Sequence, residues 1–184
     1  MKAAFCNEVS RAFFFVIILI MVGCANTPPV DEFMNARTSD NFTDQGAIAI
    51  FDADYRFTII LVKDLEWALH SIMIADYRLP YISQFSRNEK VTPYLTFGTF
   101  GMENVDLTYS IKLQRPDGQF APGEYHNMVI ARSSVVASNT YQAQEYATIS
   151  FDETDALGIY QCHIIMKDSG NVTNACIMQF ELTE

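Results

Sequence analysis

The chain has 184 residues, 49% of them hydrophobic and 13% aromatic, and its formal net charge is −10 at pH 7. A chain of this length and apolar content is sufficient for one folded domain with a core of its own, which excludes an intrinsically disordered protein. The acidic excess argues against nucleic acid or an anionic lipid surface as a partner, because both require a surplus of Lys and Arg. A cationic partner is compatible with this charge, although acidic surfaces also keep proteins soluble without any partner.

An apolar run covers residues 12–22 and follows the basic residues Lys2 and Arg11. The run is far shorter than the ~20 residues that a membrane-spanning helix requires. Gly23 and Cys24 come directly after it. A basic start, a short apolar run and a small residue before a cysteine together resemble the signal peptide and lipobox of bacterial lipoproteins.

The lipoprotein resemblance implies that residues 1–23 are a signal peptide and that Cys24 carries the lipid anchor of the mature protein. Ala25 is not the aspartate associated with inner-membrane retention, so the resemblance implies the outer membrane, facing the periplasm. Residues 24–45 are rich in Asn, Thr, Pro and Asp and predict a flexible tether. A plain secretory signal remains the alternative.

Two further cysteines, Cys162 and Cys176, lie in the part of the chain that would be exported. An even pair in an oxidising compartment predicts a disulfide. Metal binding is the rival interpretation, but a zinc site requires about four ligands at a characteristic spacing, which the sequence lacks. We therefore expect no metal and no cofactor. A bridge directly across one hairpin would leave residues 168–170 as its loop.

The folded domain is expected over residues 46–184, beginning with strands at 47–53 and 56–62. Asp64 is then placed to cap a short amphipathic helix. Trp67 lies on this predicted helix and is expected to pack it against the domain.

The chain after residue 88 is almost wholly strand-like. The predicted strands cover residues 91–100, 106–114, 128–132, 145–151, 157–167 and 172–183. Residues 106–114 alternate cleanly between apolar and polar side chains, which is typical of a half-buried antiparallel strand. The sequence Pro116-Asp117-Gly118 follows and predicts a turn.

Residues 155–162 place Tyr160 two positions before Cys162. This segment resembles the tyrosine corner of immunoglobulin-like sandwiches, and residues 88–184 are similar to secreted bacterial immunoglobulin-like or macroglobulin-like domains of uncharacterised role. The resemblance implies a mainly β fold, an immunoglobulin-like antiparallel β-sandwich with one short N-terminal helix. No earlier strand supplies a cysteine for the usual inter-sheet bridge, and Trp67 falls on the predicted helix. The ligands of antibody domains therefore do not carry over.

Three residue groups are candidates for chemistry, and none has the pattern that its chemistry requires. They are His126 with Ser133 and Ser134, the acids Asp152, Glu153 and Asp155, and the pair Asp52 and Asp54. The two serines lie outside a Gly-x-Ser-x-Gly nucleophile elbow. The group at 152–155 lacks the spacing of a calcium-binding loop, and the pair Asp52 and Asp54 has no visible catalytic partner. The sequence therefore predicts no catalytic residues.

The function expected from the sequence is a non-catalytic binding or structural module that is anchored to the envelope and meets a protein partner. The loops of a sandwich usually carry such functions. The candidate binding residues are Pro116, Asp117, Tyr125, His126, Asp152, Glu153 and Asp155. One alternative is an inhibitor or immunity protein that blocks a cationic periplasmic enzyme, and a hydrolase ranks last.

Overall fold

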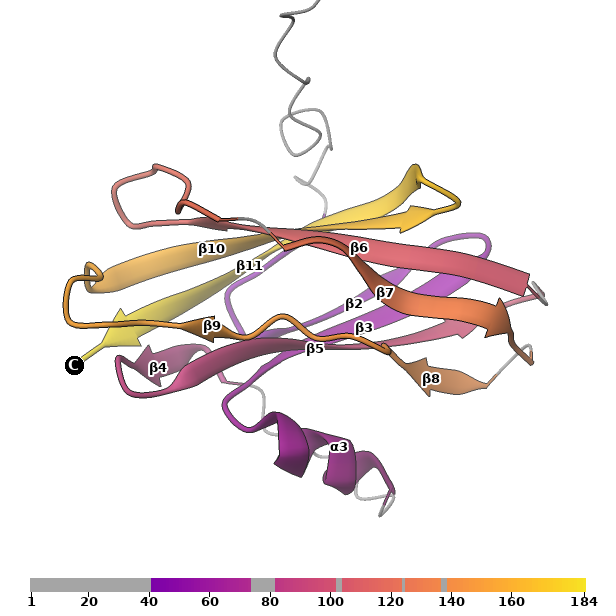
Figure 1. Ribbon diagram of the computed structural model, residues 1–184, viewed down its shortest axis with the longest axis horizontal. Coiled ribbons are helices and arrows are strands. Elements are labelled where there is room, and N and C mark those ends of the chain that lie inside the picture. The colour runs from indigo at the N-terminus through magenta and orange to yellow at the C-terminus, as the bar shows by residue number, and fades with distance from the viewer. Residues whose placement is uncertain (1–40, 74–81, 102–103, 124, 137–138) are drawn as a thin grey trace, which may run out of the picture. The chain divides into compact units, whose positions relative to one another are not determined.

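The computed structural model describes residues 41–73, 82–101, 104–123, 125–136 and 139–184 (Figure 1). These residues form two β-sheets that pack around one apolar core, so the predicted mainly β sandwich is confirmed. No helix among them is long and apolar enough to cross a membrane. The signal peptide, Cys24 and the tether as far as residue 40 lie outside the described residues.

The first sheet has the strand order β1-β11-β10-β6-β7, and β4 also pairs with β11. Strands β1 and β4 run parallel to β11, whereas the other pairs are antiparallel. The strands are β1 (Phe42–Thr43), β4 (Gln84–Ser86), β6 (Asn104–Gln114), β7 (Tyr125–Ser134), β10 (Gly158–Asp168) and β11 (Asn171–Thr183).

The second sheet has the order β2-β3-β5-β8, and β9 also pairs with β5. Its strands are β2 (Ala47–Phe51), β3 (Tyr55–Val62), β5 (Lys90–Thr99), β8 (Thr140–Gln142) and β9 (Ile149–Ser150). Pro93 lies in β5 between the segments that pair with β8 and β9. A proline is tolerated there because no described strand pairs with β5 on that side at this position.

Alternation along the strands places the core between the sheets. Leu107, Tyr109 and Ile111 of β6 are almost completely buried, as the pattern of residues 106–114 predicts. They meet the inward residues of the opposite sheet, among them Phe57 and Ile59 of β3. Burial of such side chains contributes roughly 1.5–3 kcal/mol each and is the main force that holds the two sheets together.

The helix α3 (Leu65–Met73) lies outside the sandwich. The backbone N–H of Trp67 donates to the Asp64 carboxylate over 2.9 Å, so the predicted N-cap is confirmed. Ala68 is fully buried against Val62 and Tyr94, whereas Trp67 is 46% exposed. The prediction that Trp67 packs the helix down was therefore wrong. Neighbouring residues of a helix point about 100° apart, so when the small Ala68 faces the sheet the adjacent Trp67 is turned away from it.

Two predicted boundaries require correction. The tether was expected to extend to residue 45, but β1 pairs with β11, and Asn41 also hydrogen-bonds to that strand. Residues 145–151 were predicted as one strand, yet only β9 forms there. The preceding segment instead crosses between the sheets, because Ala143 N–H donates to Leu95 and Glu145 N–H donates to Val129. These backbone N–H groups therefore have hydrogen-bond partners although the segment forms no regular strand.

The hairpin of β10 and β11 has a different register from the predicted one. Cys162 lies opposite Met178 and Cys176 lies opposite Ile164, two positions away from the direct pairing that we expected. One position of this shift arises at the turn, because only Ser169 and Gly170 link the strands, where three residues were expected, and both have positive φ. The second position of the shift arises from a bulge between Met166 and Lys167.

The two cysteines are buried free thiols, so the predicted disulfide is not formed. They are diagonal neighbours on the core face, where Cα atoms are about 7–8 Å apart, beyond the usual reach of a disulfide. Burial raises the pKa of both thiols, that of Cys176 to about 12. The predicted core face is nevertheless correct. Its members Tyr160, Cys162, Ile164, Met166, Cys176, Met178, Phe180 and Leu182 are all buried.

Tyr160 joins the loop before β10 to the core. Its hydroxyl donates to the backbone carbonyl of Ala156 over 2.8 Å, and its ring is 1% exposed. The ring stacks on Phe180 with centroids 5.7 Å apart and meets Phe151 edge-on at 5.2 Å. The Tyr160 side chain therefore fixes the loop that precedes β10 to the core.

Candidate functional site

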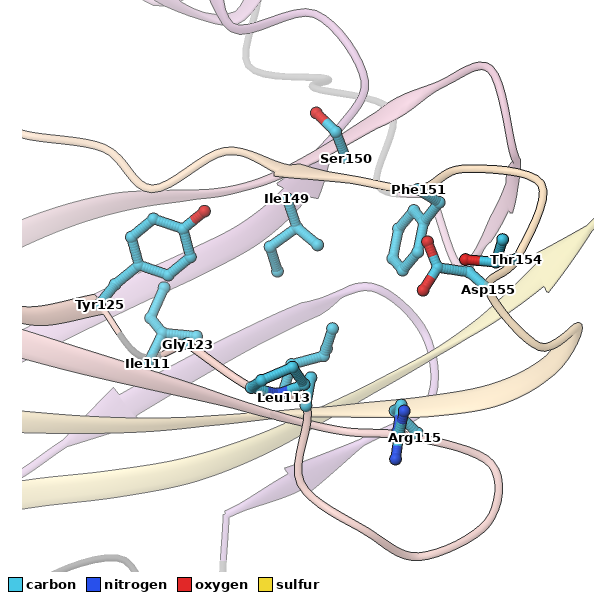
Figure 2. Close-up of a pocket in the computed structure, with 12 residues that line it drawn as sticks. Ile111, Leu113, Arg115, Gly123, Tyr125, Ile149, Ser150, Phe151, Thr154 and Asp155 are labelled. Atoms are coloured by element: carbon cyan, nitrogen blue, oxygen red, sulfur yellow. The ribbon is translucent and has the colours of Figure 1, made fainter.

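A cavity of about 570 Å³ opens between the β6–β7 loop and the β9–β10 loop, and we call it the loop cleft (Figure 2). Its volume is within the roughly 300–1,000 Å³ that is typical of ligand pockets. The lining residues are Ile111, Leu113, Arg115, Ala121, Pro122, Gly123, Tyr125, Ile149, Ser150, Phe151, Thr154 and Asp155. Both loops that the sequence singled out therefore contribute to one site.

The β6–β7 loop begins with the predicted turn. Gly118 has a φ of +81° and donates its N–H to the carbonyl of Arg115 over 2.9 Å. The Asp117 carboxylate accepts from the N–H of Gln119 over 2.9 Å. The chain then returns along β6, where Ala121 N–H donates to Leu113 over 2.8 Å. This return brings an apolar segment of the loop to the cleft.

The β9–β10 loop is organised by its own acidic residues. The Asp152 carboxylate accepts from the N–H of Thr154 over 2.7 Å and from its hydroxyl over 2.6 Å. The Asp155 carboxylate accepts from the N–H of Asp152 over 2.7 Å. The bonds from Thr154 hold the pKa of Asp152 below its usual value. Asp152 therefore stays ionised, and both carboxylates are held in defined positions.

Four large apolar side chains line the cleft beside its polar groups. Ile111 and Leu113 come from β6, and Ile149 and Phe151 come from β9 and the residue after it. Tyr125 and Phe151 lie at opposite ends of the cleft, with Ile149 between them (Figure 2). The hydroxyl of Tyr125 donates to the carbonyl of Thr148 over 3.0 Å, which joins the start of β7 to the segment before β9. Tyr125 itself is 41% exposed.

Two arginines lie among the acidic groups around the cleft. Arg115 pairs with Asp117 at 3.4 Å. Arg87 donates to the carbonyl of Asp155 over 2.8 Å and lies 3.8 Å from the Glu184 carboxylate. Arg87 thus connects the β9–β10 loop to the residues that follow β4 and β11, whereas the ion pair of Arg115 lies within the β6–β7 loop.

The sequence predicted the loops better than the individual side chains. Tyr125 and Asp155 line the cleft. Pro116, Asp117, Asp152 and Glu153 lie in the same loops next to the lining, and His126 is exposed on β7 and does not line the cleft. The sequence reading missed Arg115 and the apolar lining residues, because strand alternation marks a side chain as inward-facing without showing that a cavity borders it.

The groups that were considered for chemistry have structural partners. The hydroxyl of Ser134 donates to Asn104 over 2.8 Å. Asp52 caps the β2–β3 turn by accepting the N–H groups of Asp54 and Tyr55, and it also contacts Asn174. Within the residues that the structure describes, no group of His, Cys, Asp or Glu side chains is arranged to hold a metal ion.

No protein-family model matches the sequence, and no curated protein matches it. Solved structures with similar parts include the Pseudomonas fluorescens alkylpurine DNA glycosylase AlkC bound to DNA, at 14% identity, over 55% of this chain and 28% of that one, with a TM-score of 0.38. A Niemann-Pick type C2 protein from the Japanese carpenter ant has 5% identity, over 54% of this chain and 79% of that one, with a TM-score of 0.39. A family 123 glycoside hydrolase from Clostridium perfringens has 11% identity, over 63% of this chain and 25% of that one, with a TM-score of 0.38.

Proposed function

We propose that this protein is a non-catalytic binding module of the bacterial cell envelope. In this proposal Cys24 carries a lipid anchor in the outer membrane, the folded domain faces the periplasm, and a protein partner binds at the loop cleft. The anchor is supported by the basic start, the short apolar run and the Gly23-Cys24 step of the sequence.

An immunoglobulin-like topology is part of this proposal, and the connectivity supports it. β5 passes from one sheet to β6 in the other, β10 and β11 form the last hairpin, and β4 runs parallel to β11 beside it. The hydrogen bond from Tyr160 to Ala156 is the contact expected at the tyrosine corner of such domains. In domains of this kind the loops at the ends of the sandwich are the usual binding surfaces.

The observation that carries the binding function is the meeting of two loops, both selected from sequence, at one cleft. The cleft is lined by apolar side chains together with a few charged and polar groups, which is the usual composition of a recognition site. Its lining residues include neither histidine nor cysteine, and its carboxylate, Asp155, is already bonded to the backbone of Asp152. The arrangement therefore suits binding better than proton transfer.

Site-specific photo-crosslinking in the native envelope tests the proposal. A photoreactive phenylalanine analogue at Tyr125 should give a discrete covalent adduct with an envelope protein. The same analogue at Val136, which is 65% exposed and follows the opposite end of β7 from Tyr125, is the matched control and should give none. The proposal fails when Tyr125 gives no adduct or when both positions give the same adducts.

A further inference from the structure

We propose that the loop cleft selects a cationic protein segment with an apolar anchor. The anchor side chain enters the cleft, and flanking Lys or Arg side chains meet the carboxylates at its margin. This inference rests on the proposed function, because it takes the cleft as the site of the protein partner.

The first argument is the charge around the cleft. The charged residues that line the cleft are Asp155 and Arg115. Asp117, Asp152 and Glu153 lie in the same two loops, and Glu184 lies 3.8 Å from Arg87, which bonds to the β9–β10 loop. Lys90 pairs with the lining residue Ser150, so among the described residues of this region five carboxylates face three cationic groups. Both arginines already contact an acceptor of the protein. The remaining negative charge is therefore available to a cationic ligand, and it attracts such a ligand from a distance.

The second argument is that three of these carboxylates are held in place before any partner arrives. Asp152 is fixed by the N–H and hydroxyl of Thr154, and Asp155 is fixed by the N–H of Asp152. Asp117 is held by the N–H of Gln119 and by Arg115. Groups that are already ordered lose little conformational entropy on binding, so less of their electrostatic attraction to a ligand is offset by that loss.

The third argument is the apolar surface beside these charges. The apolar side chains of Ile111, Leu113, Ile149 and Phe151 line the cleft, and Tyr125, which also lines it, is 41% exposed. Protein interfaces concentrate their binding energy in a buried apolar anchor that is surrounded by a polar rim. The cleft and its margin have that composition.

Charge complementarity also separates this occupant from the others. Anionic lipid and nucleic acid would be repelled by the same carboxylates. A second copy of this chain docking through the same surface would bring two acidic margins together, which is unfavourable. A cationic protein segment with an apolar anchor can contact both the apolar side chains of the cleft and the carboxylates around it.

Binding of designed peptides by calorimetry tests the inference. The probe is the hexapeptide Lys-Lys-Leu-Phe-Lys-Lys, compared with one in which Leu and Phe are Ser and with one in which every Lys is Glu. At low salt the probe should bind at least tenfold more tightly than either comparison peptide. Its affinity should fall as salt is raised, because the Debye length shortens to about 8–10 Å at physiological ionic strength.

Charge reversal locates the effect. The double variant Asp117→Lys/Glu153→Lys should lose at least tenfold in affinity for the probe. The matched control Asp54→Lys/Glu66→Lys changes the net charge equally at exposed positions away from the cleft and should change the affinity less than twofold. The cleft variant Tyr125→Ser should also weaken binding, since it removes an apolar wall.

Three results would overturn the inference: no measurable binding of the probe, equal binding of the acidic peptide, or equal losses in the two charge-reversal variants. A doubled mass in sedimentation that disappears on charge reversal at the cleft would overturn it in favour of a second copy. If the partner crosslinked at Tyr125 is captured equally well by Asp117→Lys/Glu153→Lys, the proposed function stands and the inference alone fails.

Discussion

The contacts of Tyr160 permit a quantitative test of how the β9–β10 loop is fixed. Tyr160→Phe removes only the hydroxyl that donates to Ala156 over 2.8 Å and keeps the ring contacts with Phe180 and Phe151. A net intramolecular hydrogen bond contributes about 0.5–1.5 kcal/mol. Ala156 is exposed, so water can replace the lost donor at its carbonyl. We therefore expect Tyr160→Phe to lower the free energy of unfolding by about 1 kcal/mol.

Tyr109→Phe is the matched comparison, because Tyr109 is equally buried in the same core. Its hydroxyl donates to the carbonyl of Glu145 over 2.9 Å and accepts from the N–H of Ala147 over 3.2 Å. Ala147 is only 1% exposed, so the substitution leaves a buried N–H without a partner. Such a group adds about 1–3 kcal/mol to the cost. The Tyr109→Phe variant should therefore be the less stable of the two.

Equilibrium unfolding in urea measures both variants. The midpoint should fall for each with an unchanged slope, because the surface exposed on unfolding stays the same. In a domain of this size about 1 kcal/mol corresponds to a melting temperature lower by roughly 2–4 °C. The account of the Tyr160 contacts is wrong when Tyr160→Phe is as stable as the wild type, or when it is less stable than Tyr109→Phe.

Three further predictions concern other parts of the chain. Cys162 and Cys176 should not react with a thiol reagent at pH 8 in the folded protein, because burial raises their pKa, and both should react after denaturation without reductant. A denatured, unreduced chain without reactive thiols would instead establish a bridge. Glu89→Gln should lower stability at pH 7, because the hydrogen bond and ion pair with Lys63 at 2.5 Å hold the pKa of Glu89 below its usual value. This contribution is present above the unfolded pKa of about 4.3 and is lost as the pH falls through the lower folded pKa, so an unchanged acid limb in the variant would contradict it. Cys24→Ser should leave the precursor unacylated and uncleaved by mass spectrometry, whereas a mature wild-type chain that starts elsewhere would refute the lipobox interpretation.

Long elements with a clear period were predictable from sequence. The alternation of β6 identified its core face, and the inward residues of β10 and β11 were assigned correctly even though their register was not. Burial of one face depends on local alternation alone, whereas register also depends on turn length and bulges. The two-residue turn at Ser169-Gly170 and the bulge after Met166 leave little trace in the hydrophobic pattern, and together they separate Cys162 from Cys176.

Short edge elements could not be predicted in the same way. β1 and β4 are two and three residues long and pair in parallel with β11, so no periodicity can build up along them. Trp67 was misassigned because size and hydrophobicity favoured packing, whereas the helix makes its closest contact through Ala68. Each of these features is decided by tertiary contacts rather than by local sequence.

The candidate site was predictable as two loops but not as a cleft. Turn residues marked the segment from Pro116 and the acidic segment from Asp152, and both form ordered turns. Their meeting depends on the fold, because β6 leads into one loop, β9 leads into the other, and the two strands belong to different sheets. Arg115 and Ile149 became visible as site residues only in this arrangement.

The most direct test of the central claim is the mapping of backbone amide shifts by NMR while the cationic peptide is titrated into the folded domain. We expect the largest changes at residues 111–123 and 149–155, which line the loop cleft, and no comparable change in the β2–β3 turn at 52–54. Shifts that centre on the 52–54 turn, or that leave the cleft residues unchanged while the peptide binds, would contradict the assignment of the loop cleft as the binding site.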